Sequence, residues 1–197
     1  MYEKEYENIV EAIVEYGYIV VENILDNKSL ELLVSEALNE KLYKNAGIST
    51  LSKVDSTRRK DKIRWLEGEQ KGEKLFLEFT EGLREYINRS LYLGLSYYEA
   101  HFALYEEGDF YEKHLDAFRG SKNRVVTTVY YLNDAWSEKD GGELLIYDED
   151  NKLIESIKPS ANTLVVFLSD KFPHEVLPAK KKRHSIAGWF RVDKREY

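Results

Sequence analysis

The sequence contains no cysteine and no long apolar run. Without cysteine the chain can form neither disulfides nor thiolate metal sites, which is consistent with a reducing compartment. No apolar stretch approaches the length needed to span a membrane, and the acidic start lacks the apolar segment of a signal peptide. We therefore expect a cytoplasmic protein without a membrane partner.

Basic residues are also fewer than acidic residues. The 29 Lys and Arg residues are outnumbered by 36 Asp and Glu residues, which gives a formal net charge of −7 and a pI near 5.3. No basic stripe is available to neutralise phosphates, so we expect no nucleic-acid partner, although a local basic run lies at 180–183. The composition, 43% hydrophobic and 33% charged, is typical of a single globular domain of this length.

Helical periodicity is concentrated in the first part of the chain. Apolar residues recur at helical spacing in three places, at 9–14, 30–38 and 75–87, and a short buried strand is expected at 18–21. Asp26 is a suitable cap for the second helix. Between the second and third helices, Lys44 to Lys62 is polar and charged. This stretch predicts a long mobile loop that could close over a substrate.

Short strand-like runs separated by turn residues fill the rest of the chain. The predicted strands are Tyr97–Tyr105, Phe110–His114, Arg124–Leu132, Glu143–Tyr147, Leu153–Ile157, Thr163–Phe167, Glu175–Leu177 and Arg183–Val192. Seven or eight antiparallel strands at this spacing predict a mainly β sandwich or jelly roll, with about three N-terminal helices buttressing one sheet. We expect one domain over 1–197, in which 1–92 provides helical support and the lid loop and 93–197 forms the jelly-roll core.

The pair His114-x-Asp116, followed later by His174, has the most chemical content. Side chains two residues apart on a strand point to the same side, so His114 and Asp116 converge if this segment is a strand end. Two imidazoles and one carboxylate hold a non-haem Fe(II) on one face and leave the opposite positions open for a co-substrate and O₂. The non-functional alternatives are that His114-x-Asp116 occurs by chance and that His174 is a solvated histidine in a turn.

Arg183 adds a cation to this set. A guanidinium grips a carboxylate through two parallel hydrogen bonds. On its strand-like run, Arg183 shares a face with Ser185, Ala187 and Trp189, and small neighbours leave room for a bound molecule. With the three metal ligands, Arg183 predicts an iron enzyme that consumes a dicarboxylic keto acid. Because Arg183 closes a basic run, the alternative is an ordinary solvated charge.

Several segments spread over almost the whole chain resemble one known family. They are Arg59-x-Asp61-Lys62-Ile63-x-Trp65-Leu66-Glu67-Gly68, Tyr111-x-x-His114-x-Asp116, Arg124-Val-Val-Thr-Thr-Val-Tyr-Tyr131-Leu-Asn133, Trp136, Gly141-Gly142-x-Leu144, Pro173-His174-Glu175-Val176 and Arg183 through Trp189. They resemble the prolyl 4-hydroxylase family of Fe(II)/2-oxoglutarate-dependent dioxygenases, including the oxygen-sensing (HIF-type) prolyl hydroxylases and their small microbial relatives. The segment that begins at Arg59 is more specific than the metal triad, which many oxygenases share.

The resemblance implies a double-stranded β-helix fold that binds Fe(II), 2-oxoglutarate as co-substrate and O₂, with L-ascorbic acid as a further ligand. By this resemblance His114, Asp116 and His174 bind iron. Arg183 pairs with the distal carboxylate of 2-oxoglutarate, and Tyr131 donates a hydrogen bond to the same group. The alternative for Tyr131 is a core tyrosine whose hydroxyl has a protein partner.

Five further residues match pocket or entrance positions of that family. Tyr105 matches a tyrosine that binds 2-oxoglutarate, on condition that one residue is missing from the loop after it. Trp189 matches a tryptophan near the iron and the substrate, with core packing as its alternative. Arg59, Asp61 and Arg124 match residues that shape the substrate entrance, with surface ion pairs as their alternative.

The resemblance implies a prolyl hydroxylase that acts on a proline in a protein or peptide partner, coupling oxidative decarboxylation of 2-oxoglutarate to C–H hydroxylation. One alternative keeps the cofactors but hydroxylates a small molecule or another side chain, and a second is a catalytically silent jelly-roll binding module. Ala117-Phe118 and Ala187 depart from the animal oxygen sensors, and the sequence stops at Tyr197 without their C-terminal extension. We therefore expect a protein closer to the small microbial members, of an oligomeric state that the sequence does not indicate.

Overall fold

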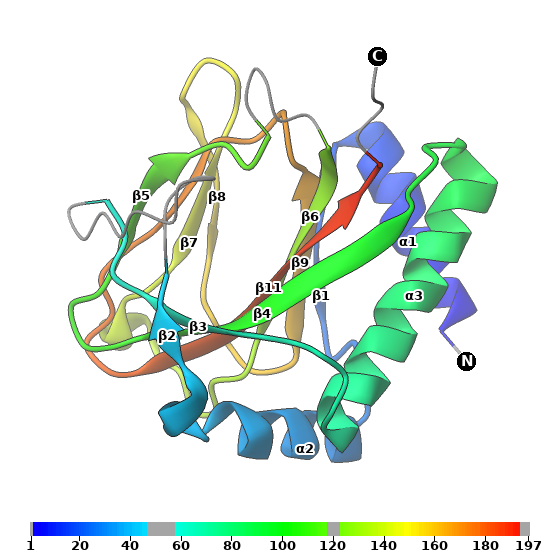
Figure 1. The fold of residues 1–197 in the computed structure, drawn as a ribbon. Helices are drawn as coiled ribbons and strands as arrows, with labels where there is room; N and C mark the ends of the chain where they lie inside the picture. The colour runs from blue at the N-terminus through cyan, green and yellow to red at the C-terminus, as the bar shows by residue number, and fades with distance from the viewer. Residues whose placement is uncertain (1, 47–57, 118–122, 194–197) are drawn as a thin grey trace.

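Two antiparallel sheets face each other in the computed structural model, and helices pack on the outer side of the larger sheet (Figure 1). The structure describes residues 2–46, 58–117 and 123–193. The helices are α1 (Glu3–Glu15), α2 (Asn27–Ala37) and α3 (Lys71–Leu91), with two short 3-10 turns, η1 (Glu40–Leu42) and η2 (Glu138–Asp140). Within the described ranges, no helix is both long enough and apolar enough to cross a membrane.

The first four strands belong to one sheet, and from β4 onward the chain passes back and forth between the two sheets. The large sheet has the order β1-β9-β6-β11-β4-β3-β2 and contains β1 (Tyr18–Glu22), β2 (Lys44–Asn45), β3 (Lys62–Trp65), β4 (Tyr97–Tyr105), β6 (Arg124–Tyr131), β9 (Thr163–Leu168) and β11 (Arg183–Arg191). The small sheet has the order β5-β10-β7-β8 and contains β5 (Tyr111–His114), β7 (Leu144–Tyr147), β8 (Leu153–Ile157) and β10 (His174–Val176). This arrangement is a jelly roll, so the predicted fold class is confirmed.

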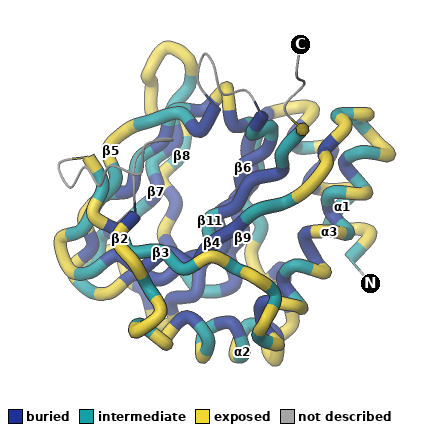
Figure 2. The backbone as a smooth tube through the Cα atoms, viewed as in Figure 1, coloured by how far each residue is buried: buried dark blue, intermediate teal, exposed yellow. Residues whose placement is uncertain are grey.

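Two apolar layers hold these elements together, and Figure 2 shows the central strands as the most deeply buried part of the chain. One layer lies between the helices and the large sheet and includes Ile9, Leu33, Phe76, Tyr130 and Phe190. The other lies between the two sheets and includes Tyr105, Tyr131, Ile146, Phe167 and Val176. Neighbours on one strand, such as Tyr130 and Tyr131, enter different layers because side chains alternate across a strand.

Two carboxylates satisfy backbone donors at helix starts. Asp26, the predicted cap, accepts a hydrogen bond from Ser29 N at 3.0 Å at the start of α2. Glu36 of α2 accepts from Gly72 N at 2.6 Å and Glu73 N at 2.9 Å, the first turn of α3. These N–H groups have no partner within their own helix, so Glu36 both caps α3 and fixes its position beside α2.

The strands predicted from residue 97 onward are confirmed, each end to within one residue. The loop predicted from Lys44 to Lys62 is wrong at both ends, because β2 begins at Lys44 and β3 begins at Lys62. Residues 47–57 of that loop lie outside the described residues. β3 is only four residues long, so the alternation of charged and apolar residues from Lys62 to Trp65 is a weak signal, and its pairing with β4 supplies the backbone hydrogen bonds that make it a strand.

Burial at the helix ends also differs from the prediction. Val14 and Leu38 were expected on buried faces but are 66% and 58% exposed. Val14 lies in the last turn of α1 and Leu38 is the C-cap of α2, so both exposed residues lie at helix ends. The predicted strand at 18–21 is confirmed as β1, but as an edge strand that is only partly buried. The first 92 residues therefore contribute strands to the large sheet as well as helices.

Candidate metal centre and carboxylate pocket

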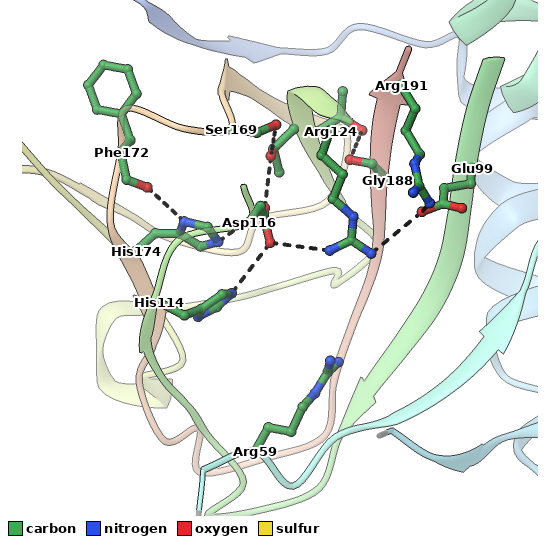
Figure 3. Close-up of polar contacts among 12 residues, drawn as sticks. Arg59, Glu99, His114, Asp116, Arg124, Ser169, Phe172, His174, Gly188 and Arg191 are labelled. Carbon is green, nitrogen blue, oxygen red and sulfur yellow. Dashed lines mark hydrogen bonds and ion pairs between the residues drawn. The ribbon is translucent and has the colours of Figure 1, made fainter. Parts of the chain in front are cut away.

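Three side chains predicted as metal ligands meet at the ends of two strands of the small sheet (Figure 3). His114 ends β5, Asp116 follows it, and His174 begins β10 directly opposite His114. The Asp116 carboxylate lies 3.7 Å from His114 Nε2 and 3.6 Å from His174 Nε2, and one donor atom from each residue lies within 4.8 Å of the others. Two imidazole nitrogens and a carboxylate oxygen so placed suit the facial coordination of Fe(II).

Backbone carbonyls set the orientation of both imidazoles. His114 Nδ1 lies 2.8 Å from Glu112 O, and His174 Nδ1 lies 3.0 Å from Phe172 O. A carbonyl only accepts, so Nδ1 carries the proton and Nε2 keeps its lone pair for a metal. Burial, followed by the effect of His174, lowers the pKa of His114 to about 3, which keeps this ring neutral.

The surroundings of Asp116 keep its carboxyl group ionised. Burial alone raises its pKa, but His174 and His114 outweigh that effect and bring the pKa below its ordinary value. Thr127 Oγ1 donates a hydrogen bond to Asp116 Oδ2 at 2.8 Å, and Arg124 Nη1 lies 3.9 Å from Oδ1. Donors and positive charge around a buried carboxylate favour its ionised form.

Arg183 lies inside the protein, so it is not a solvated member of a charge run. It is 1% exposed and pairs with Tyr105 across β11 and β4. Its guanidinium carbon lies 5.0 Å from the Tyr105 ring centre and 5.1 Å from the Tyr131 ring centre. Arg183 Nη2 and the Tyr131 hydroxyl have no hydrogen-bond partner of good geometry among the described residues. A cationic donor and a neutral donor, side by side and buried, suit a carboxylate.

Gly142 makes room for this guanidinium. Arg183 Nε donates to Gly142 O at 2.9 Å, and Nη1 donates to Ser185 Oγ at 3.3 Å. Gly142 has a φ of +74°, and a Cβ there would lie 3.2 Å from Arg183 Cδ and 2.9 Å from Ala179 Cβ. The glycine is therefore required both by the backbone conformation and by the close approach of the arginine.

Arg59 and Asp61 form a buried pair beside the metal ligands, not a surface ion pair. Arg59 Nε and Nη2 lie 2.7 Å and 2.6 Å from the two Asp61 oxygens, and the side chains are 12% and 0% exposed. Arg59 stacks on the Tyr111 ring at 4.4 Å, and that ring stacks in turn on His114 at 3.7 Å. The pair therefore supports one metal ligand through an aromatic side chain.

Arg124 and Trp189 are also neighbours of Asp116. The Arg124 guanidinium lies 3.7 Å from the centre of the Trp189 ring. Glu99 Oε1 lies 3.5 Å from Arg124 and also accepts a hydrogen bond from Arg191 (Figure 3). Trp189 is 7% exposed. It is therefore both a core residue and a neighbour of the metal site, so the two readings of this tryptophan do not exclude each other.

Comparison with known proteins identifies the family. A model of the 2OG-Fe(II) oxygenase superfamily matches residues 100–191. A crystal structure of a prolyl-4-hydroxylase from Pseudomonas putida is 36% identical, with a TM-score of 0.88, over 94% of this chain and 98% of that chain. The chain belongs to the 2OG-Fe(II) oxygenase superfamily. As its name states, this superfamily uses Fe(II) and 2-oxoglutarate, which are the two groups that the donor set and the Arg183 pocket fit.

Other 2OG-Fe(II) oxygenases resemble the chain over most of its length. A prolyl hydroxylase from Trichoplax adhaerens, solved with a hypoxia inducible factor peptide fragment, is 28% identical with a TM-score of 0.89 over 98% of this chain and 91% of that chain. Human Egl nine homolog 1 is 33% identical over 196 residues, 93% of this chain and 46% of the relative. The chain spans 46%, 28% and 58% of the length of the first three curated relatives.

Two contacts of this oxygenase were not predicted from sequence. Tyr111 was noted as part of a motif, but its stacking on His114 was not anticipated. Thr127 lies in one of the segments that carry the family resemblance, but its bond to Asp116 was not predicted. The signal for Thr127 was available, because a hydroxyl on the inward face of β6 must find a partner when it is buried.

Proposed function

We propose that this chain is an Fe(II)- and 2-oxoglutarate-dependent dioxygenase that hydroxylates a prolyl residue in a protein or peptide. One observation carries the proposal: the metal ligands and Arg183 face the same interior between the two sheets. Phe167 links them, since its ring lies 4.8 Å from the His174 ring and belongs to the apolar layer that contains Tyr131. A keto acid held by Arg183 would therefore direct its other end towards the ligand triad.

The Arg183 pocket suits the distal carboxylate of 2-oxoglutarate. Arg183 Nη2 and the Tyr131 hydroxyl are two buried donors without protein partners of good geometry. Burial raises the pKa of Tyr131 to about 12 against the opposing effect of Arg183, so the hydroxyl remains protonated and able to donate at neutral pH. Hydrogen bonds from these groups to a carboxylate are charge-assisted and poorly screened in a buried pocket.

His114, Asp116 and His174 are the residues that would hold iron, which when bound supplies the activation of O₂. The chain itself holds both imidazoles with Nε2 directed inward and keeps Asp116 ionised. His174 and Asp116 are 5% and 8% exposed. This burial limits the access of water to the reacting groups.

The choice of a prolyl substrate rests on the relatives and on the entrance of the site. The relatives in Pseudomonas and Trichoplax are named prolyl hydroxylases, and the latter was solved with a peptide fragment. Arg124 is 29% exposed and lies over Trp189 at the rim of the site. A cation held in place at the rim by a buried aromatic ring suits the carbonyl groups of an extended peptide better than a small uncharged metabolite.

Mass spectrometry of proline-containing peptides incubated with Fe(II), 2-oxoglutarate and O₂, with and without ascorbate, tests the proposal. We expect one oxygen atom added to a proline and one succinate formed for each hydroxylation. His174→Ala should abolish both products. Glu175→Gln is the matched control, because Glu175 adjoins His174 in sequence but pairs with Tyr147.

Two outcomes would reject the prolyl assignment. Efficient hydroxylation of a free metabolite, with every peptide unmodified, would favour the small-molecule alternative and retain the cofactors. A wild-type chain that neither binds Fe(II) nor decarboxylates 2-oxoglutarate would leave the silent jelly-roll module.

A further inference from the structure

A chain of two hydroxyl groups leads away from the Asp116 carboxylate into the protein. Thr127 Oγ1 donates to Asp116 Oδ2 at 2.8 Å, and Ser169 Oγ lies 2.8 Å from Thr127 Oγ1. Ser169 is 0% exposed and Thr127 is 2% exposed. Figure 3 draws Ser169 and Asp116 at the two ends of this chain of bonds.

The chemistry of these groups fixes the direction of both hydrogen bonds. An ionised carboxylate only accepts, so the single hydroxyl proton of Thr127 goes to Asp116. Thr127 Oγ1 must then accept from Ser169, whose own proton points towards it. Hydrogen bonds in such a chain strengthen one another, so the serine supports the bond that holds the carboxylate.

The backbone of Ser169 is hydrogen-bonded to residues close in sequence to Thr127 and to Asp116. Ser169 N donates to Val125 O at 3.0 Å, at the start of the strand that carries Thr127. Ala117 N, directly after Asp116, donates to Ser169 O at 3.2 Å. The serine follows β9 and opens the segment that leads to His174, whose Nδ1 faces Phe172 O in that same segment. One short segment therefore fixes the surroundings of two of the three metal ligands.

We infer that Ser169 is a positioning residue that acts through Thr127 to fix the rotation of the Asp116 carboxylate, and with it the affinity of the triad for a divalent metal. This inference rests on the proposed function, because it requires that the triad bind a metal. Outer groups that orient metal ligands typically change metal affinity by about 10- to 100-fold when removed. Neither hydroxyl touches the metal donors of the two histidines.

Thr128 is a matched control for Thr127. It is the next residue on β6, is 1% exposed, and directs its hydroxyl to the opposite face of the sheet. There Thr128 Oγ1 lies 2.7 Å from the Tyr98 hydroxyl. Replacing either threonine by valine removes one buried hydroxyl of the same type from the same strand, but only one replacement alters the surroundings of Asp116.

Metal affinity measured on the full-length chain tests the inference. Mn(II) is titrated into the metal-free protein, free Mn(II) is followed by electron paramagnetic resonance, and thermal unfolding is recorded for each variant. We expect Thr127→Val to bind Mn(II) about 10- to 100-fold more weakly than wild type. The Mn(II) affinity of Ser169→Ala should lie between those of wild type and Thr127→Val. Thr127→Ser, which keeps the hydroxyl, should restore wild-type binding, and Thr128→Val should bind normally even if it unfolds earlier.

The double variant Thr127→Val/Ser169→Ala decides whether the serine acts through the threonine. The inference expects it to bind Mn(II) as Thr127→Val does, because the support of Ser169 has no further effect once Thr127 cannot donate. Additive losses would show that Ser169 acts independently and would overturn the inference. Equal losses in Thr127→Val and Thr128→Val would also overturn it by pointing to stability alone. Failure of the wild-type chain to bind Mn(II) or Fe(II) would instead contradict the proposed function.

Discussion

Replacing Tyr131 by phenylalanine should affect ligand binding and stability in opposite directions. The change removes one hydroxyl and leaves the ring that packs between the two sheets. Tyr131 is 0% exposed, and its hydroxyl has no hydrogen-bond partner of good geometry among the described residues. The substitution therefore removes a buried hydroxyl whose polar neighbour is the Arg183 guanidinium and which makes no hydrogen bond of good geometry to the described residues.

The size of both effects follows from that position. Burying a polar group without a partner costs about 1–3 kcal/mol, so Tyr131→Phe should leave the free energy of unfolding unchanged or raise it by up to that amount. A hydrogen bond to a charged acceptor contributes about 1.5–3 kcal/mol. Its loss should weaken 2-oxoglutarate binding by roughly 10- to 150-fold.

Calorimetric titration of 2-oxoglutarate into the Mn(II)-loaded protein measures the affinity, and urea unfolding of the metal-free protein measures stability. Trp189→Phe serves as a comparison, because it changes an aromatic residue near the iron site without altering the Arg183 pocket. A Tyr131→Phe variant that loses stability and keeps its affinity would show that the hydroxyl serves the core and not the keto acid.

Three further perturbations test the electrostatics and packing of the fold. Glu36→Ala removes the acceptor for two backbone N–H groups of α3 and should lower stability by about 0.5–2 kcal/mol in urea unfolding, whereas the exposed Glu31→Ala on the same helix should not. Burial lowers the pKa of His101 from 6.5 to about 4, so the unfolded chain takes up the proton first as the pH falls. The contribution of His101 to the free energy of unfolding should be fully present above about pH 6.5 and should fall by about 3 kcal/mol as the pH is lowered towards 4. In His101→Asn this part of the pH dependence should be missing. A Cβ at Gly188 would overlap the Tyr98 hydroxyl, so Gly188→Ala should lower stability by about 1–3 kcal/mol, and an unchanged melting temperature would contradict this packing.

Most of the fold could be predicted from local patterns. The strands after residue 97 are short runs, mostly of apolar, aromatic and β-branched residues, with turn residues at their ends, so their bounds followed from the sequence. The strand β3 was missed because its four residues alternate too briefly to stand out from the charged stretch before it, and it forms by pairing with β4. The exposure of Val14 and Leu38, both at helix ends, likewise could not be told from helical spacing alone.

The metal ligands and Arg183 could be predicted from the sequence because their combination is rare, whereas residues with common hydroxyl side chains could not. A histidine, an aspartate, a second histidine and an arginine in this order suggest few functions, and the structure brings the triad together and buries Arg183. Thr127 and Ser169 carry hydroxyls that occur throughout the chain. Their connection to Asp116 depends on β6 and the segment after β9 meeting in space, which no local pattern indicates.

Anaerobic titration of Fe(II) in the presence of 2-oxoglutarate tests the central claim most directly, with the visible charge-transfer absorption of an iron–keto-acid complex as the signal. We expect an absorption band that saturates at one Fe(II) per chain in the wild-type protein and is absent in His174→Ala. A band that persists in His174→Ala, or a wild-type chain without any band, would contradict the assignment of the triad.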